Sequence, residues 1–153
     1  MNRFLLIAAL TAATYFSYFP APSSSDSTGV TAQSEVSSLA RENSQTAIDR
    51  AYANHLGNQQ VEGEGTVVKT LADDRNGSRH QRFIVRLDSG LTVLVAHNID
   101  LASRIDALRE GDTIAFYGEY EWNSKGGVIH WTHRDPQGRH PGGWIRHNGQ
   151  TYQ

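Results

Sequence analysis

Apolar and polar residues alternate along the chain after Gln60, which is the pattern of half-buried β-strands. A turn-forming Asp88-Ser89-Gly90 separates two of these runs, and residues 123–127 separate the last two. The alternation therefore predicts successive strands joined by short turns, with one apolar face each. The five predicted strands cover residues 61–67, 82–87, 91–95, 113–122 and 128–133.

Between the third and fourth strands the apolar spacing becomes helical. Leu101, Ile105 and Leu108 are four and three residues apart, Asn98 or Asp100 could cap the segment, and Gly111 would end it. The order is then strand, strand, strand, short helix, strand, strand, which is the order of the OB-fold. We expect an all-β domain over 61–153, a small OB-like five-stranded β-barrel, followed by a C-terminal β-hairpin over Trp144–Tyr152.

The segment before the barrel carries a narrow apolar stripe at helical spacing. We expect an amphipathic helix over 39–60, ended by Gly57, which packs on the barrel. Residues 23–38 are rich in Ser and Thr, so we expect a disordered linker there. The apolar stripe consists of Ala47, Ile48, Ala51, Tyr52, His55 and Leu56.

Residues 1–22 have the features of a secretory signal peptide. Arg3 precedes an uncharged run from Phe4 to Phe19, and Pro20 follows it. A membrane-spanning helix needs about 20 apolar residues, so an N-terminal anchor is the second choice. We expect an exported protein, periplasmic or secreted, that meets signal peptidase and keeps no stable membrane span after cleavage.

Composition limits the chemistry. The chain has 153 residues, enough for one ordinary domain, and its 14 basic and 16 acidic residues give a net charge of -2. There is no cysteine, which excludes disulfides, thiol nucleophiles and thiolate metal sites. Only His, Asp, Glu and hydroxyl side chains are left to perform chemistry.

Four of the seven histidines lie in residues 122–153. His130 and His133 are three apart on a predicted strand, so they should point to opposite faces. His133 and Asp135 should share a face, and with His140 and His147 they are candidate ligands for a divalent metal such as zinc. The alternative is that these histidines bond loop backbone or face solvent, and no cofactor is certain.

The same residues suggest a catalytic alternative, a metal-dependent hydrolase of the phosphodiesterase or nuclease type. His133 or His140 would be the base and Asp135 its orienting partner. The run from Asp135 to His140 resembles the Asp-Arg-Gly-His motif of metal-dependent nonspecific nucleases, although here the chain continues into a hairpin and not into a ligand-bearing helix. Asp135 before Pro136 could also simply begin a turn.

The leading interpretation is a binding domain. OB-folds bind oligonucleotides and oligosaccharides through aromatic and basic side chains. Arg82 and Arg86 share a face of the second strand, and Tyr117 is the best candidate for exposed stacking. We expect a polyanion, a glycan or another envelope ligand at a site formed by Arg82, Arg86, Tyr117, His130, Trp131, Trp144 and His147.

Four stretches carry a family resemblance: residues 77–83, 96–100, 118–122 and the His-Trp-Thr-His run at 130–133. With them, the chain from Val61 to Gln153 resembles an uncharacterised family of small exported bacterial proteins, a domain of unknown function marked by that His-Trp-Thr-His motif. The resemblance implies no activity. It implies that residues 130–133, and with them Asp135, His140, Trp144 and His147, are shared features of the family.

Overall fold

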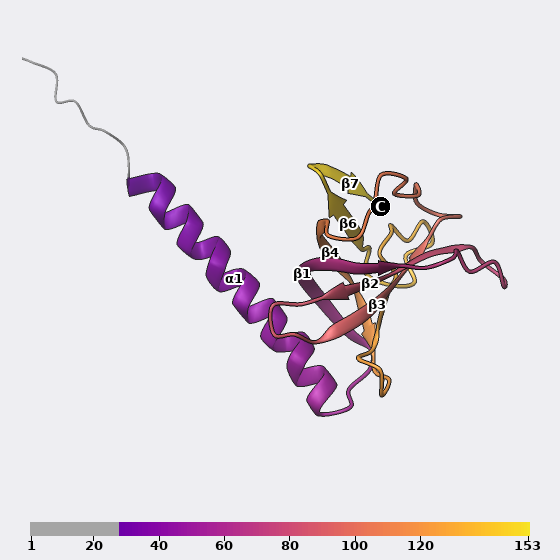
Figure 1. Cartoon of the computed structure of the whole chain (residues 1–153), viewed down its shortest axis with the longest axis horizontal. Coiled ribbons are helices and arrows are strands. Elements are labelled where there is room, and N and C mark those ends of the chain that lie inside the picture. Colours follow the sequence, from indigo (N-terminus) through magenta and orange to yellow (C-terminus); the bar gives the residue numbers. More distant parts are fainter. Residues whose placement is uncertain (1–27) are drawn as a thin grey trace, which may run out of the picture.

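The computed structural model describes residues 28–153 (Figure 1). The predicted signal peptide or anchor over 1–22 and the beginning of the predicted linker lie outside the described residues. Within the described part of the chain, no helix combines the length and the apolar character that crossing a membrane requires.

Seven strands form one continuous sheet in the part of the chain that the structure describes. Five of them correspond to the alternating runs of the sequence, and the last two form the predicted C-terminal hairpin. In chain order they are β1 (Gln59–Thr70), β2 (His80–Arg86), β3 (Thr92–Asn98), β4 (Thr113–Glu121), β5 (Val128–His130), β6 (Trp144–His147) and β7 (Gln150–Tyr152).

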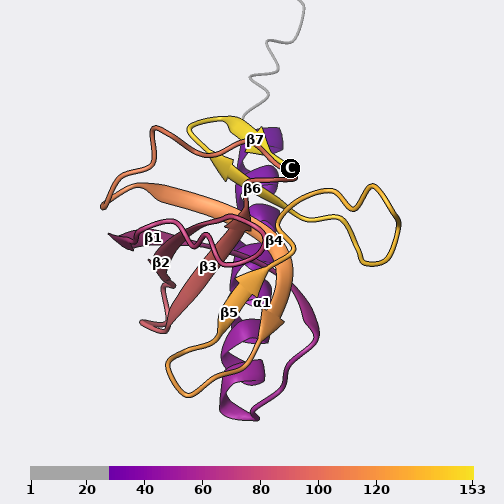
Figure 2. The ribbon, with the colours of Figure 1, turned by 90° about the vertical axis from the view of Figure 1, so that its right-hand side faces the viewer.

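The first five strands close into a barrel in the order β1-β2-β3-β5-β4, and β4 returns to pair with β1. All barrel pairings are antiparallel except β3 with β5, which is parallel. This five-stranded barrel confirms the OB-like fold predicted from the alternation. Figure 2 shows β3, β5 and β4 beside one another.

Alternate residues of the barrel strands fill its interior. Phe83, Val95, Phe116, Tyr120 and Ile129 are completely buried there. A Cβ added at Gly63 would lie 2.6 Å from the Phe116 ring, so the missing side chain lets this ring pack against β1. The inward residues thus form the core and leave the intermediate positions of each strand on the outer face.

The C-terminal hairpin extends the barrel sheet. Its first strand pairs with the first half of β4, and its turn contains Asn148 and Gly149, both with positive φ. Positive φ at both central residues is the requirement of a type I′ hairpin turn, which Asn-Gly meets well. The predicted hairpin is confirmed.

The N-terminal helix is longer and earlier than the sequence indicated. α1 spans Thr28–Ala53 and not 39–60, and Gln59 and Gln60 belong to β1. Residues 28–38 are therefore helical and not a disordered linker, since no Gly or Pro interrupts the chain from 30 to 53. The helix ends at Ala53, before Gly57, because His55 takes a left-handed φ and the Leu56 N–H bonds the Ala51 carbonyl.

The residues of α1 that are buried against the barrel lie in its second half. Ile48 is completely buried and Ala51 nearly so, whereas Val36 and Leu39 are 66% and 59% exposed. The indole N–H of Trp122 donates to the Tyr52 carbonyl at 3.1 Å and fixes the docked end. The first half of the helix projects from the barrel (Figure 1).

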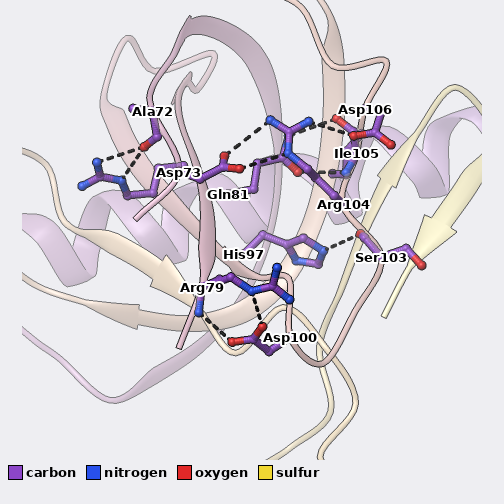
Figure 3. Close-up of polar contacts among 11 residues, drawn as sticks. Ala72, Asp73, Arg79, Gln81, His97, Asp100, Ser103, Arg104, Ile105 and Asp106 are labelled. Carbon is purple, nitrogen blue, oxygen red and sulfur yellow. Dashed lines mark hydrogen bonds and ion pairs between the residues drawn. The ribbon is translucent and has the colours of Figure 1, made fainter. Parts of the chain in front are cut away.

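The short helix predicted between β3 and β4 is absent, and turns replace it. Side chains of the barrel bond the backbone groups that a helix would have paired. The Gln81 amide donates to the Ile105 carbonyl and accepts from the Ile105 N–H, at 3.0 and 2.8 Å. His97 bonds the Ser103 carbonyl, and Arg104 pairs with Asp73 and Asp106 (Figure 3).

Candidate functional site

The regular strand geometry on the outer face of the barrel ends with β5. This strand stops at His130, and Trp131 follows with a φ of 52°. Such a left-handed conformation is uncommon for a bulky residue. It breaks the strand alternation, so His130 and His133 line the same cavity and not opposite faces as the spacing predicted.

The left-handed Trp131 bends the chain after β5, and the next residue, Thr132, anchors this bend in the core. Its hydroxyl donates to Nδ1 of the completely buried His97 at 2.8 Å, and Nε2–H of His97 donates to the Ser103 carbonyl at 3.2 Å. Burial lowers the pKa of His97 to about 4, against the opposing effect of the Ser103 bond. His97 is thus a neutral imidazole that joins β3, residues 99–112 and the bend.

A cavity of about 490 Å³ lies beside the bend, on the outer side of the barrel. It is bounded by the start of β2, the end of β3 and the loop that runs from β5 to β6, which Figure 2 shows extending from the barrel. Four of the seven histidines meet here. The lining residues are Ser78, His80, Asn98, Leu101, His130, Trp131, His133, Arg139 and His140.

Two of these histidines have a defined free nitrogen. Nδ1–H of His80 donates to the Ser78 carbonyl at 2.8 Å, and Nδ1–H of His133 donates to the Arg134 carbonyl at 2.7 Å. A carbonyl oxygen only accepts, so Nδ1 carries the proton of each neutral ring. Each Nε2 then has a lone pair, and within residues 28–153 neither has a hydrogen-bond partner.

His140 is held more tightly. Its Nδ1–H donates to the Pro141 carbonyl at 2.8 Å, and its ring stacks on Trp131 with centroids 4.2 Å apart. Its Nε2 lies 3.9 Å from Asp135 Oδ2, which is beyond hydrogen-bond distance. His140 and Trp131 together form one wall of the cavity.

Asp135 organises the loop. Its carboxylate accepts the backbone N–H groups of Gln137, Arg139 and His140. Burial raises the pKa of Asp135, but these hydrogen bonds outweigh burial and hold it below its usual range. Both oxygens are used by the turn, so the structure favours the turn-forming interpretation of this residue.

His147 lies apart from the cavity. It is buried on β6, and its Nε2–H donates to Asp112 at 2.8 Å. The Arg109 N–H and this histidine lower the pKa of Asp112. The four predicted metal ligands, His133, Asp135, His140 and His147, therefore do not converge on one point.

A different group of side chains does converge. One carboxylate oxygen each of Glu119 and Glu121 and one imidazole nitrogen of His130 lie within 4.8 Å of one another, and all three residues are half-buried. Glu119 is directly opposite His130 in the β4–β5 pairing. Sequence reasoning missed this group, although the alternation of Glu119 and Glu121 on one strand face was a visible signal.

Gln60 continues the same row on β1, opposite Glu119. Among the described residues 28–153, neither polar atom of its side chain nor Nε2 of His130 has a hydrogen-bond partner, and all three atoms are buried. His130 Nε2 is 3.3 Å from Glu119 Oε1. Burial lowers the pKa of His130, while Glu119 and Glu121 act in the opposite direction.

The remaining predicted ligand-binding residues are outside the cavity. The Arg82 guanidinium donates two bonds to the Ala72 carbonyl, and Arg86 is exposed at the other end of β2. Tyr117 stacks on Trp144 with centroids 6.2 Å apart, and Arg146 lies 4.0 Å over the Trp144 ring. This aromatic pair is on the β4–β6 side of the sheet.

These features define an all-β protein of the OB-like barrel class with a histidine-lined cavity on its outer face. Residues 30–153 match the family described as "protein of unknown function (DUF3465)", and the chain belongs to that family. No curated protein matches the chain.

Proposed function

We propose that this protein is a glycan-binding domain whose ligand occupies the histidine-lined cavity. The observation that carries this proposal is the pair of free Nε2 lone pairs on His80 and His133, fixed by their Nδ1–H bonds to carbonyl oxygens. A concave site in which a few precisely placed polar groups fix the orientation of the ligand is the usual form of a small-molecule site.

The polar groups of the cavity suit a polyhydroxylated ligand. A sugar hydroxyl can donate to the Nε2 lone pairs of His80 and His133, and it can accept from Arg139. A phosphate only accepts, so it would face those lone pairs unfavourably unless the imidazoles were protonated. Arg139 would also pair with the carboxylate of an acidic sugar. The cavity chemistry thus favours a glycan over nucleic acid.

The hydrolase alternative has less support. It requires Asp135 to orient His133 or His140, but both Asp135 oxygens already accept backbone N–H groups. Oδ2 lies 3.9 Å from His140 Nε2, and Nδ1–H of His133 donates to the Arg134 carbonyl. Within residues 28–153, no hydrogen bond joins the Asp135 carboxylate to either imidazole ring.

The test is a binding titration of the untagged full chain, followed by intrinsic tryptophan fluorescence. The probes are a peptidoglycan disaccharide, an oligogalacturonate and a deoxythymidine 15-mer. We expect one of the glycans to bind, and His80→Ala to raise its dissociation constant by about 10-fold, the loss of about one hydrogen bond.

Arg86→Ala is the matched control, because Arg86 lies on the same strand as His80 but outside the cavity. We expect it to leave the dissociation constant of the glycan unchanged. An equal loss of glycan affinity in His80→Ala and Arg86→Ala would contradict the proposal. Binding of the oligonucleotide alone would also contradict it.

We further propose that the protein is exported. The support is the uncharged run from Phe4 to Phe19 after Arg3. Fractionation of cells expressing the full chain should recover it outside the cytoplasm, shortened at its N-terminus. Recovery of the full-length chain in the cytoplasm would exclude export.

A further inference from the structure

We propose that Glu119, Glu121 and His130 bind a first-row divalent metal ion, such as zinc, on the outer face of β4 and β5. This site differs from the metal site that the sequence predicted. It goes beyond the glycan proposal and does not depend on it, although His130 borders both sites.

The geometry of the three ligands is close to that of a bound ion. Zinc lies about 2.0–2.2 Å from nitrogen and carboxylate ligands, so two ligands of one ion are at most about 4.4 Å apart. The three ligand atoms already lie within 4.8 Å of one another. Small side-chain rotations would bring them into the first coordination shell.

The backbone holds these side chains in place. Glu119 and His130 are directly opposite in an antiparallel pair, and Glu121 is the diagonal neighbour on the same face. Glu121 is fixed further by the Asn58 N–H, which donates to its Oε1 at 3.1 Å. A metal-ligating carboxylate is commonly held by such an additional hydrogen bond.

Unsatisfied polar atoms supply a second observation. Within residues 28–153, the buried side-chain nitrogen and oxygen atoms without a hydrogen-bond partner are Nε2 of His130, which lies 3.3 Å from Glu119 Oε1, and the two polar atoms of Gln60. They belong to one row across β1, β4 and β5, with Glu119 between them. A buried unpaired polar atom costs about 1–3 kcal/mol, and a metal ion with a bound water would satisfy these atoms.

The ligand set indicates the kind of metal. One imidazole and two carboxylates suit zinc or another first-row divalent ion, whereas calcium and magnesium favour oxygen ligands alone. Three protein ligands leave a coordination position for water, as in sites with an open position. Gln60, next to Glu119, is placed to hydrogen-bond such a water.

The test is calorimetric titration of the untagged full chain with zinc, with calcium as the comparison ion. We expect one zinc ion per chain and little binding of calcium. The Glu119→Gln, Glu121→Gln double variant should raise the zinc dissociation constant by about 100-fold or more, because even second-sphere changes cost about 10–100-fold. Glutamine keeps the Oε1 acceptor that Asn58 needs.

Glu62→Gln is the control, since Glu62 is exposed on neighbouring β1, and it should bind zinc like the wild-type chain. His133→Ala, in the cavity only, should also keep zinc binding. If His133→Ala lost zinc binding while the double variant kept it, this assignment would be overturned. The absence of zinc binding by the wild-type chain would also overturn it. Neither result would bear on glycan binding, which the His80→Ala titration tests separately.

Discussion

Gly143→Ala is expected to destabilise the barrel by about 3 kcal/mol, which lowers the melting temperature on the order of 10–20 °C. A Cβ at this position would lie inside van der Waals contact with the carbonyl oxygens of Trp131 and Tyr117. Both are backbone atoms, so they cannot move aside cheaply. The Gly143 N–H also bonds the His133 carbonyl at 2.8 Å. A shift of Gly143 would therefore also move the loop from β5 to β6 that borders the cavity.

Gly142→Ala is the matched control one residue earlier. Its added Cβ would meet only the Arg134 Cα, at an ordinary 3.7 Å. We expect a change within about 0.5 kcal/mol, as for most surface substitutions. Chemical denaturation measures the stability of both variants. Equal stabilities would contradict the close packing of Gly143 against the Trp131 and Tyr117 carbonyl oxygens.

Acidification from pH 7 to pH 4 is expected to remove about 3 kcal/mol of stability through His97 alone. Burial lowers its pKa to about 4 in the folded chain, against an ordinary value of 6.5. Between these two values the unfolded chain binds a proton that the folded chain does not, so stability falls as the pH falls. Below about pH 4 both states are protonated and this loss stops growing.

The comparison with His97→Gln isolates this contribution. Glutamine can accept from Thr132 and donate to the Ser103 carbonyl, but it does not titrate. Denaturant unfolding between pH 4 and pH 7 should therefore show a shallower pH dependence in the variant, by about 3 kcal/mol across the range. The same slope in both proteins would mean that His97 is not a buried neutral imidazole.

The barrel could be predicted from the sequence because its strands have one buried face. Alternation places residues such as Phe83 and Val85 inside without any knowledge of their partners. The turn residues Asn148 and Gly149 likewise encode the hairpin locally. The fold class therefore followed from short-range patterns.

The helices were harder to predict from the sequence, because distant side chains help to decide whether a segment becomes helical. Residues 101–108 have helical spacing, but the buried amide of Gln81 on β2 pairs the Ile105 backbone groups instead. For α1, Ser and Thr content suggested a linker over 23–38, yet the helix begins at Thr28. Propensity is a weak guide at such a boundary.

The candidate site was predicted only in part. The sequence singled out His130, His133 and His140, but it placed the first two on opposite faces because the left-handed Trp131 has no local signature. His80 reaches the cavity from β2, and Glu119 and Glu121 meet His130 across a strand pairing. These contacts between residues far apart in the sequence depend on the closure of the barrel and not on spacing along the chain.

The most direct measurement is long-range proton–nitrogen NMR of the histidine rings at neutral pH, before and after glycan is added. We expect His80 and His133 to carry their proton on Nδ1, and their Nε2 resonances to shift when the ligand binds. Protons on Nε2 of both rings in the free protein, or ligand-induced shifts confined to residues outside the cavity, would contradict this expectation.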